Sequence, residues 1–157
     1  MSNFIEVVFE NIDKKSVKPL IKLLGDRSYK IIAINCTEDI KNMKKDEISN
    51  EALNHFLELN CDASISINAE ALVLEELVLP EVFIRVVKYE SKYDIDFSFN
   101  SNEIENISIS TFINELHECA KNLSYRYCVE NVYGGMEPAS DEKTRFFTGS
   151  KPGPLMP

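Results

Sequence analysis

The residues able to do chemistry are two pairs of carboxylates, two histidines and four cysteines. Glu75 and Glu76 are adjacent, and Asp94 and Asp96 stand two residues apart, so the aspartates share one face if they lie on a strand. Two neighbouring carboxylates can in principle act as a general acid and a general base. The sequence places no nucleophile or partner base beside them, and acids at this spacing are more often solvated surface groups.

The histidines and cysteines do not complete a site either. His55 is expected at the boundary of a helical apolar stripe, and His117 falls outside its own stripe and is expected to be solvated. Neither has metal-ligand spacing and no C-x-x-C pair occurs, so we expect no metal and no cofactor. Free, buried thiols of a reducing cytoplasm are expected at Cys36, Cys61, Cys119 and Cys128.

Common catalytic and nucleotide-binding motifs are absent from the sequence. It contains no phosphate-cradling G-x-x-x-x-G-K-[ST] or G-x-G-x-x-G and no G-x-S-x-G nucleophile elbow. The sequence therefore favours a binding protein over an enzyme. An enzyme with an unfamiliar site would show a deep pocket lined by converging acids or histidines.

The first part of the chain predicts a strand, a helix and a strand. Apolar runs at residues 4–9 and 30–36 indicate strands, and the second is expected to be buried. Between them Asp13 or Ser16 can cap a helix, and Pro19, tolerated only in a first turn, favours the later start. This order suggests a right-handed crossover if the two strands lie parallel in one sheet.

The middle of the chain is less uniform. A second helix is predicted to follow Asp46 or Ser49. Residues 61–67 alternate between apolar and polar side chains and indicate a half-exposed strand. Residues 68–79 fit either a helix capped by Asn68 or a strand.

An antiparallel hairpin of residues 81–90 and 93–99 is the clearest element of the sequence. Both segments alternate in polarity, and a short connection joins them. We expect Arg85 and Lys88 to meet the nearby aspartates across the two strands.

The end of the chain combines a helix, a strand and a glycine-containing stretch. Ser108 or Ser110 caps a third helix, and residues 125–132 read as a last strand. Residues 133–149, YGGMEPASDEKTRFFTG, predict an ordered, irregular loop that acts as a structural cap or as a binding loop.

These elements predict an α+β fold. We expect a mixed, largely antiparallel sheet of about five or six strands with about three helices packed against it. Residues 1–150 are expected to form a single domain, and residues 151–157 a flexible tail.

Charge is distributed unevenly over a chain with a formal net charge of −9. Residues 46–124 hold sixteen acids and four bases, whereas residues 1–45 hold six acids and nine bases. This acidity argues against nucleic acid or an anionic membrane as a direct partner and suits a basic protein. A secretory signal and a membrane-spanning apolar run are both absent from the sequence, so a cytoplasmic protein is expected.

Two segments, FIRVVKYESKYDIDFSFN and YGGMEPASDEKTRFFTG, resemble immunity proteins of bacterial contact-dependent growth inhibition and polymorphic-toxin systems. The resemblance implies a protein that binds one cognate toxin domain in the producing cell and blocks its activity. Many such toxins are nucleases or tRNA-cleaving enzymes with basic clefts, which the acidic segment would complement.

The toxin-binding residues expected are acids of the 46–124 segment, with two residues of the final stretch as further candidates. They are Glu70, Glu75, Glu76, Asp94, Asp96, Tyr133 and Glu137. The alternative is a small acidic adaptor or assembly protein without catalytic activity. A gene directly after a large toxin gene would favour the immunity protein.

Overall fold

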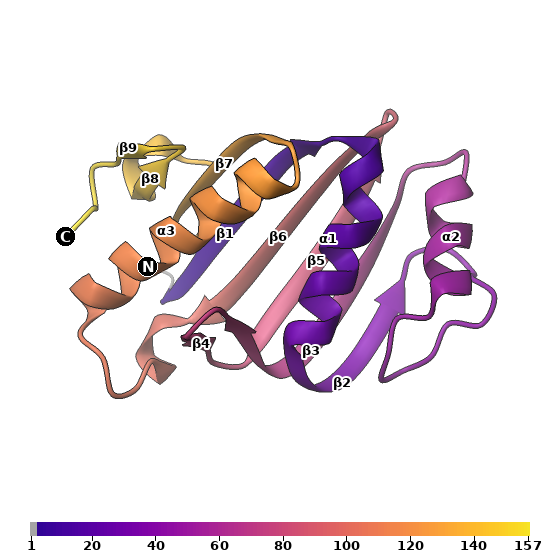
Figure 1. The fold of residues 1–157 in the computed structure, drawn as a ribbon, viewed down its shortest axis with the longest axis horizontal. Coiled ribbons are helices and arrows are strands. Elements are labelled where there is room, and N and C mark those ends of the chain that lie inside the picture. Colours follow the sequence, from indigo (N-terminus) through magenta and orange to yellow (C-terminus); the bar gives the residue numbers. More distant parts are fainter. Residues whose placement is uncertain (1–2) are drawn as a thin grey trace.

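One large sheet organises the structure (Figure 1). The computed structural model describes residues 3–157, which form nine strands, three α-helices and two short 3-10 helices. The strands are β1 (Phe4–Ile12), β2 (Ser28–Cys36), β3 (Ala63–Leu74), β4 (Leu77–Leu79), β5 (Val82–Tyr89), β6 (Lys92–Asn100), β7 (Val129–Met136), β8 (Arg145–Thr148) and β9 (Lys151–Pro152). The helices are α1 (Lys14–Arg27), α2 (Asn50–Glu58), α3 (Ile109–Arg126), η1 (Ser101–Glu103) and η2 (Glu142–Thr144).

The strand order is β2-β3-β5-β6-β1-β7-β8-β9, with β4 paired to β3. Each of these pairings is antiparallel. The predicted α+β class is therefore confirmed, although the sheet exceeds the five or six strands expected. The added strands come from residues 68–79, where the helix alternative is wrong, and from the end of the chain.

The first strand–helix–strand unit does not join neighbouring strands. Successive antiparallel pairings leave β1 and β2 parallel, with β3, β5 and β6 between them. The burial expected for β2 is wrong, because it forms one edge of the sheet and most of its residues are exposed or half-buried.

The helices begin at side-chain caps. Asp13 caps α1, so the later start at Ser16 is wrong, and Pro19 lies inside the helix. Ser49 caps α2 and Ser108 caps α3, as predicted; each hydroxyl accepts a hydrogen bond from a backbone N–H three residues on. Each helix then presents an apolar stripe to the core.

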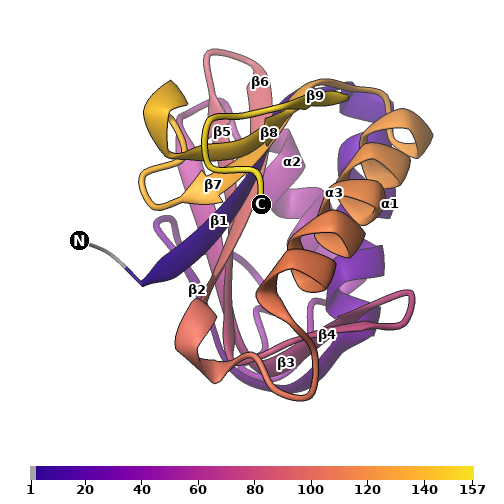
Figure 2. The ribbon, with the colours of Figure 1, turned by 90° about the vertical axis from the view of Figure 1, so that its left-hand side faces the viewer.

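The three helices cover one face of the sheet. Figure 2 shows α1 and α3 on one side, while the segment that carries η2 lies on the other. Alternate residues of the central strands face the helices and form one continuous core, including Phe9, Ile84 and Phe97. No helix among residues 3–157 is long and apolar enough to cross a membrane.

The final stretch is ordered, as predicted, but much of it is regular. Tyr125 belongs to α3 and not to the last strand, and residues 133–136 continue β7, which pairs with β8. A Cβ at Gly134 would lie 2.6 Å from the Phe147 ring, and one at Gly135 would lie 2.4 Å from a backbone oxygen. The glycines that suggested a turn therefore permit close packing within the sheet.

His117 attaches this end of the chain to α3. Its ring is 8% exposed and stacks on Phe147 with the ring centroids 4.4 Å apart, and its Nε2 lies 2.7 Å from the Gly149 carbonyl oxygen. The expectation that His117 is solvated is wrong, because the β7–β9 segment folds over that side of the helix. The Gly153 and Leu155 N–H groups donate to carbonyls of β8, so backbone hydrogen bonds reach into residues 151–157.

Candidate functional site

The face of the sheet opposite the helices is open over β3, β5 and β6. Strand pairing aligns its side chains in rows. One row runs across the sheet through Ser66, Arg85, Asp96, Val8 and Tyr133, and the next through Asn68, Phe83, Ser98, Glu6 and Gly135. We call this surface, with Val87, Tyr89, Asp94 and Glu10 beside these rows, the open sheet face.

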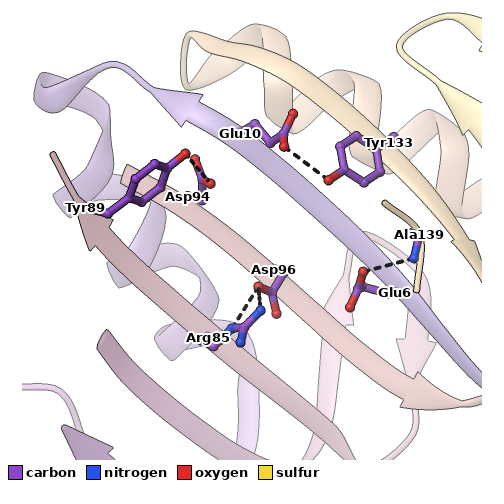
Figure 3. Close-up of polar contacts among 8 residues, drawn as sticks. All are labelled: Glu6, Glu10, Arg85, Tyr89, Asp94, Asp96, Tyr133 and Ala139. Carbon is purple, nitrogen blue, oxygen red and sulfur yellow. Dashed lines mark hydrogen bonds and ion pairs between the residues drawn. The ribbon is translucent and has the colours of Figure 1, made fainter. Parts of the chain in front are cut away.

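Hydrogen bonds fix the carboxylates of β6 on the open sheet face (Figure 3). The Arg85 Nε and Nη2 atoms donate to one oxygen of Asp96 at 3.1 and 2.9 Å. The Tyr89 hydroxyl donates to Asp94 Oδ2 at 2.9 Å, and the Asn11 N–H donates to its Oδ1 at 2.8 Å. The predicted meeting of Arg85 with an aspartate is confirmed, and both aspartates are held in place.

The carboxylates of β1 are held by the end of the chain. The Tyr133 hydroxyl donates to Glu10 Oε2 at 3.2 Å, and the Ala139 N–H donates to Glu6 Oε1 at 3.2 Å (Figure 3). Ala139 is buried against Val8 and Tyr133. Residues 137–145 therefore cover the β1–β7 side of the open sheet face and leave the β3–β5–β6 side uncovered.

Partial burial changes the ionisation of these groups. Burial raises the pKa of the Asp96 carboxyl, although its pair with Arg85 acts in the opposite direction. Burial also raises the pKa of Glu6, while the Ala139 N–H lowers it. Burial and the neighbouring Glu10 carboxylate raise the pKa of Tyr133 to about 12.

Arg145 completes the covered side. Its guanidinium lies 4.0 Å from the centroid of the Tyr133 ring, and its Nε donates to the Ala139 carbonyl at 2.8 Å. The carboxylates on and beside the open sheet face outnumber its cations, which are Arg85, Arg145 and, opposite Tyr89, Lys92. These carboxylates are Glu6, Glu10, Asp94, Asp96 and Glu137.

A second acidic surface lies where the β3–β4 turn meets α3. A groove of about 600 Å³ there is lined by four glutamates, and an adjoining groove of about 760 Å³ is lined by six. No Lys, Arg or His contributes to either lining within residues 3–157, although Lys30 pairs with Glu70 and Lys121 with Glu118. We call this surface the acidic end; its glutamates are Glu70, Glu75, Glu76, Glu81, Glu103, Glu105, Glu115 and Glu118.

The predicted binding residues fall into two groups rather than one. Asp94, Asp96 and Tyr133 lie on the open sheet face, and Glu137 lies near Glu6 and Asp96. The remaining three candidates, Glu70, Glu75 and Glu76, belong to the acidic end.

Lys88 does not meet an aspartate, so that part of the hairpin prediction is wrong. It faces the helices, is 8% exposed, and donates to the carbonyls of Phe56, Leu57 and Leu59 at the end of α2. The sequence pattern indicates this orientation, because residues two apart on a strand share a face, and Lys88 follows Val82, Ile84 and Val86 on the side that faces the core.

Sequence reasoning missed Glu6, Glu10 and Phe83 as members of the open sheet face. The spacing of Glu6 and Glu10 in a predicted strand indicates a shared face, but their proximity to Asp94 and Asp96 follows from the pairing of β1 with β6. That pairing joins residues about 90 positions apart in the chain, which local patterns do not reveal.

The remaining reactive groups form no catalytic arrangement in the described part of the chain. Residues 3–157 contain no group of three His, Cys, Asp or Glu that could hold a metal ion. The cysteines are free; Cys119 is buried and Cys36 half-buried, but Cys61 and Cys128 are exposed, so the burial predicted for these two is wrong. Burial and the nearby Glu75 carboxylate raise the pKa of Cys119 to about 12, which leaves it an unreactive thiol.

Comparisons with known proteins agree over nearly the whole chain. A family model described as PABL017 Cdi1I immunity protein matches residues 3–152. The structure also matches a chain in the 1.75 Å crystal structure of the toxic C-terminal tip of CdiA from Pseudomonas aeruginosa in complex with immune protein. The TM-score is 0.85 and the identity 32%, over 99% of both chains. No curated protein matches the chain.

Proposed function

Because the chain belongs to the Cdi1I immunity protein family, we propose that it binds and neutralises the toxin domain of its own contact-dependent growth inhibition system. The observation that carries the proposal is the family match over residues 3–152. A similar chain in a crystal structure that holds a toxic CdiA tip with its immune protein supports the same role.

We further propose that the toxin is a nuclease or a tRNA-cleaving enzyme and that the immunity protein covers a basic surface on it. The net charge of −9 supports this, because an enzyme that attracts phosphate carries Lys and Arg around its cleft. The protein acts in the cytoplasm as an inhibitor without catalysis of its own. Its proposed contact residues are Glu70, Glu75, Glu76, Asp94 and Asp96, with Tyr133 and Glu137 at their margin.

Co-expression with the toxin domain encoded next to this gene tests the function. Cells that express the toxin domain alone should stop growing, and cells that also express this chain should grow. A purified mixture should elute as one complex. Loss of protection with no complex would overturn the proposal, whereas intact RNA and DNA in poisoned cells would overturn only the nuclease assignment.

A further inference from the structure

We propose that the cognate toxin domain binds to the open sheet face, over β3, β5 and β6, with a basic surface of its own. Phe83 is the apolar anchor of this contact, and the carboxylates of β1 and β6 pair with the basic groups of the toxin. This inference rests on the proposed function and names the surface that performs it. The occupant is a folded protein domain that presents Lys and Arg around an apolar contact.

The shape of the surface supports a protein partner. Ser64, Ser66 and Ser98 give the floor small side chains, so another protein surface can approach the strands closely. Phe83 is 40% exposed on this floor between Asn68 and Ser98. Phe83 lies near the start of β5, and an exposed aromatic side chain among polar residues is typical of residues that dominate binding energy.

Residues 137–145 provide a wall along one side of the floor. Figure 2 shows the η2 segment standing on the side of the sheet opposite α1 and α3. Backbone and side-chain hydrogen bonds hold this wall, including the pair from Arg145 to Ala139 and the pair from Ala139 to Glu6. A partner that contacts the floor would therefore meet a preformed edge and would order little of the chain on binding.

Charge determines the kind of partner. Five carboxylates face three cations at this surface, Arg85, Arg145 and Lys92, and Arg85 already pairs with Asp96. Glu6, Glu10 and Asp94 are each oriented by a hydrogen bond from their own chain, which leaves them placed to accept further donors. Preorganised acceptors of this kind complement Lys and Arg of a partner.

The acidic end is the competing surface. Its glutamates are exposed, and ion pairs hold Glu70 to Lys30 and Glu118 to Lys121. The aromatic side chain that lines its grooves, Phe112, is buried and cannot serve as an anchor. We assign to it a role in long-range attraction, because rim charges act mainly on the association rate. The open sheet face then determines how slowly the complex dissociates.

The test measures binding of purified variants to the cognate toxin domain by surface plasmon resonance. Phe83→Thr and the double variant Glu6→Gln/Glu10→Gln should each raise the Kd by at least about 30-fold, through faster dissociation. Tyr29→Thr removes an aromatic ring that is 65% exposed on β2 and is the matched control for the anchor. Asp46→Asn/Glu47→Gln, at two exposed positions before α2, is the matched control for the carboxylates, and both controls should change the Kd by less than about threefold. Glu75→Gln/Glu76→Gln is measured beside them as the test of the acidic end. Circular dichroism melts establish that every variant is folded.

The outcomes separate this inference from the proposed function. If Phe83→Thr and Glu6→Gln/Glu10→Gln bind the toxin domain like the natural protein, the open sheet face is not the docking surface, while the immunity role is unaffected. Loss of binding in Glu75→Gln/Glu76→Gln alone would move the interface to the acidic end. Failure of the natural protein to bind the toxin domain would overturn the proposed function itself.

Discussion

Tyr133 is buried in the folded protein and holds its phenolic proton more tightly than a free tyrosine. Its pKa is raised to about 12, whereas in an unfolded chain it is about 10. Between these pH values the unfolded chain releases the proton that the folded protein keeps. The folded state then binds more protons, so the free energy of unfolding falls as pH rises through this window.

Tyr133→Phe removes this titration. Compared with the natural protein, it should lose less free energy of unfolding between neutral pH and about pH 11, by on the order of 1–2 kcal/mol. Urea unfolding at the two pH values measures the difference. All other ionisable groups are common to both proteins, so equal losses would show that Tyr133 does not titrate differently on folding.

Leu116 tests the packing of α3 on the sheet. It is fully buried, so Leu116→Ala should lower the free energy of unfolding by about 2–5 kcal/mol through lost contacts and a residual cavity. Glu115→Ala, at the exposed neighbouring position, is the control. An unchanged denaturant midpoint for Leu116→Ala would show that this face of α3 does not pack against the core.

At the scale of elements, Lys88 joins β5 to the end of α2. The last carbonyls of a helix lack partners within the helix, and here a buried ammonium group supplies donors to three of them. Lys88→Met keeps a flexible side chain but removes these donors, so it should destabilise the protein by about 1–3 kcal/mol. Hydrogen exchange should accelerate in α2 more than in α3, and exposed Lys92→Met is the control. An equal increase of the exchange rate in α2 and α3 would contradict this role of Lys88.

Elements whose signals are local were predictable from the sequence. The β5–β6 hairpin shows two alternating strands, and Ser49 and Ser108 cap helices within one turn of themselves. The first half of β7 was predicted, but its second half and β8 were missed because Gly134 and Gly135 read as turn residues. Only the packed Phe147 ring explains why a side chain is excluded at Gly134. His117 was misplaced for the same reason, since a helical wheel does not include the strands that later cover it.

The candidate site was half predictable. Asp94 and Asp96 were found because strand alternation turns them away from the core. Glu6 and Glu10 lie near these aspartates only because β1 pairs with β6. Glu75 and Glu76 lie elsewhere, because the turn of the β3–β4 hairpin places them beside α3.

At the scale of the molecule, the charge of −9 should govern how fast the toxin arrives. The screening length of salt falls from about 10 Å at 0.1 M to about 3 Å at 1 M, so the association rate should fall over this range. Charge reversal by Glu75→Lys/Glu76→Lys should slow association more than it speeds dissociation.

Stopped-flow mixing with the toxin domain at low and high salt measures these rates. Asp46→Lys/Glu47→Lys changes the net charge equally but lies before α2, and it should have a smaller effect. An association rate that does not depend on salt, with full protection by the Glu75→Lys/Glu76→Lys variant, would remove electrostatic attraction from the mechanism.

The position of β1 in the sheet has a consequence for the timing of protection. This strand is made first, yet it pairs with β6 on one side and with β7 on the other, and β8 and β9 then extend the sheet from β7. The nascent chain therefore cannot complete its sheet until the ribosome has made β9. At about 5–20 residues per second, synthesis from β1 to β9 takes roughly 7–30 s. A cell that must replace its immunity protein is therefore exposed to toxin for at least that interval.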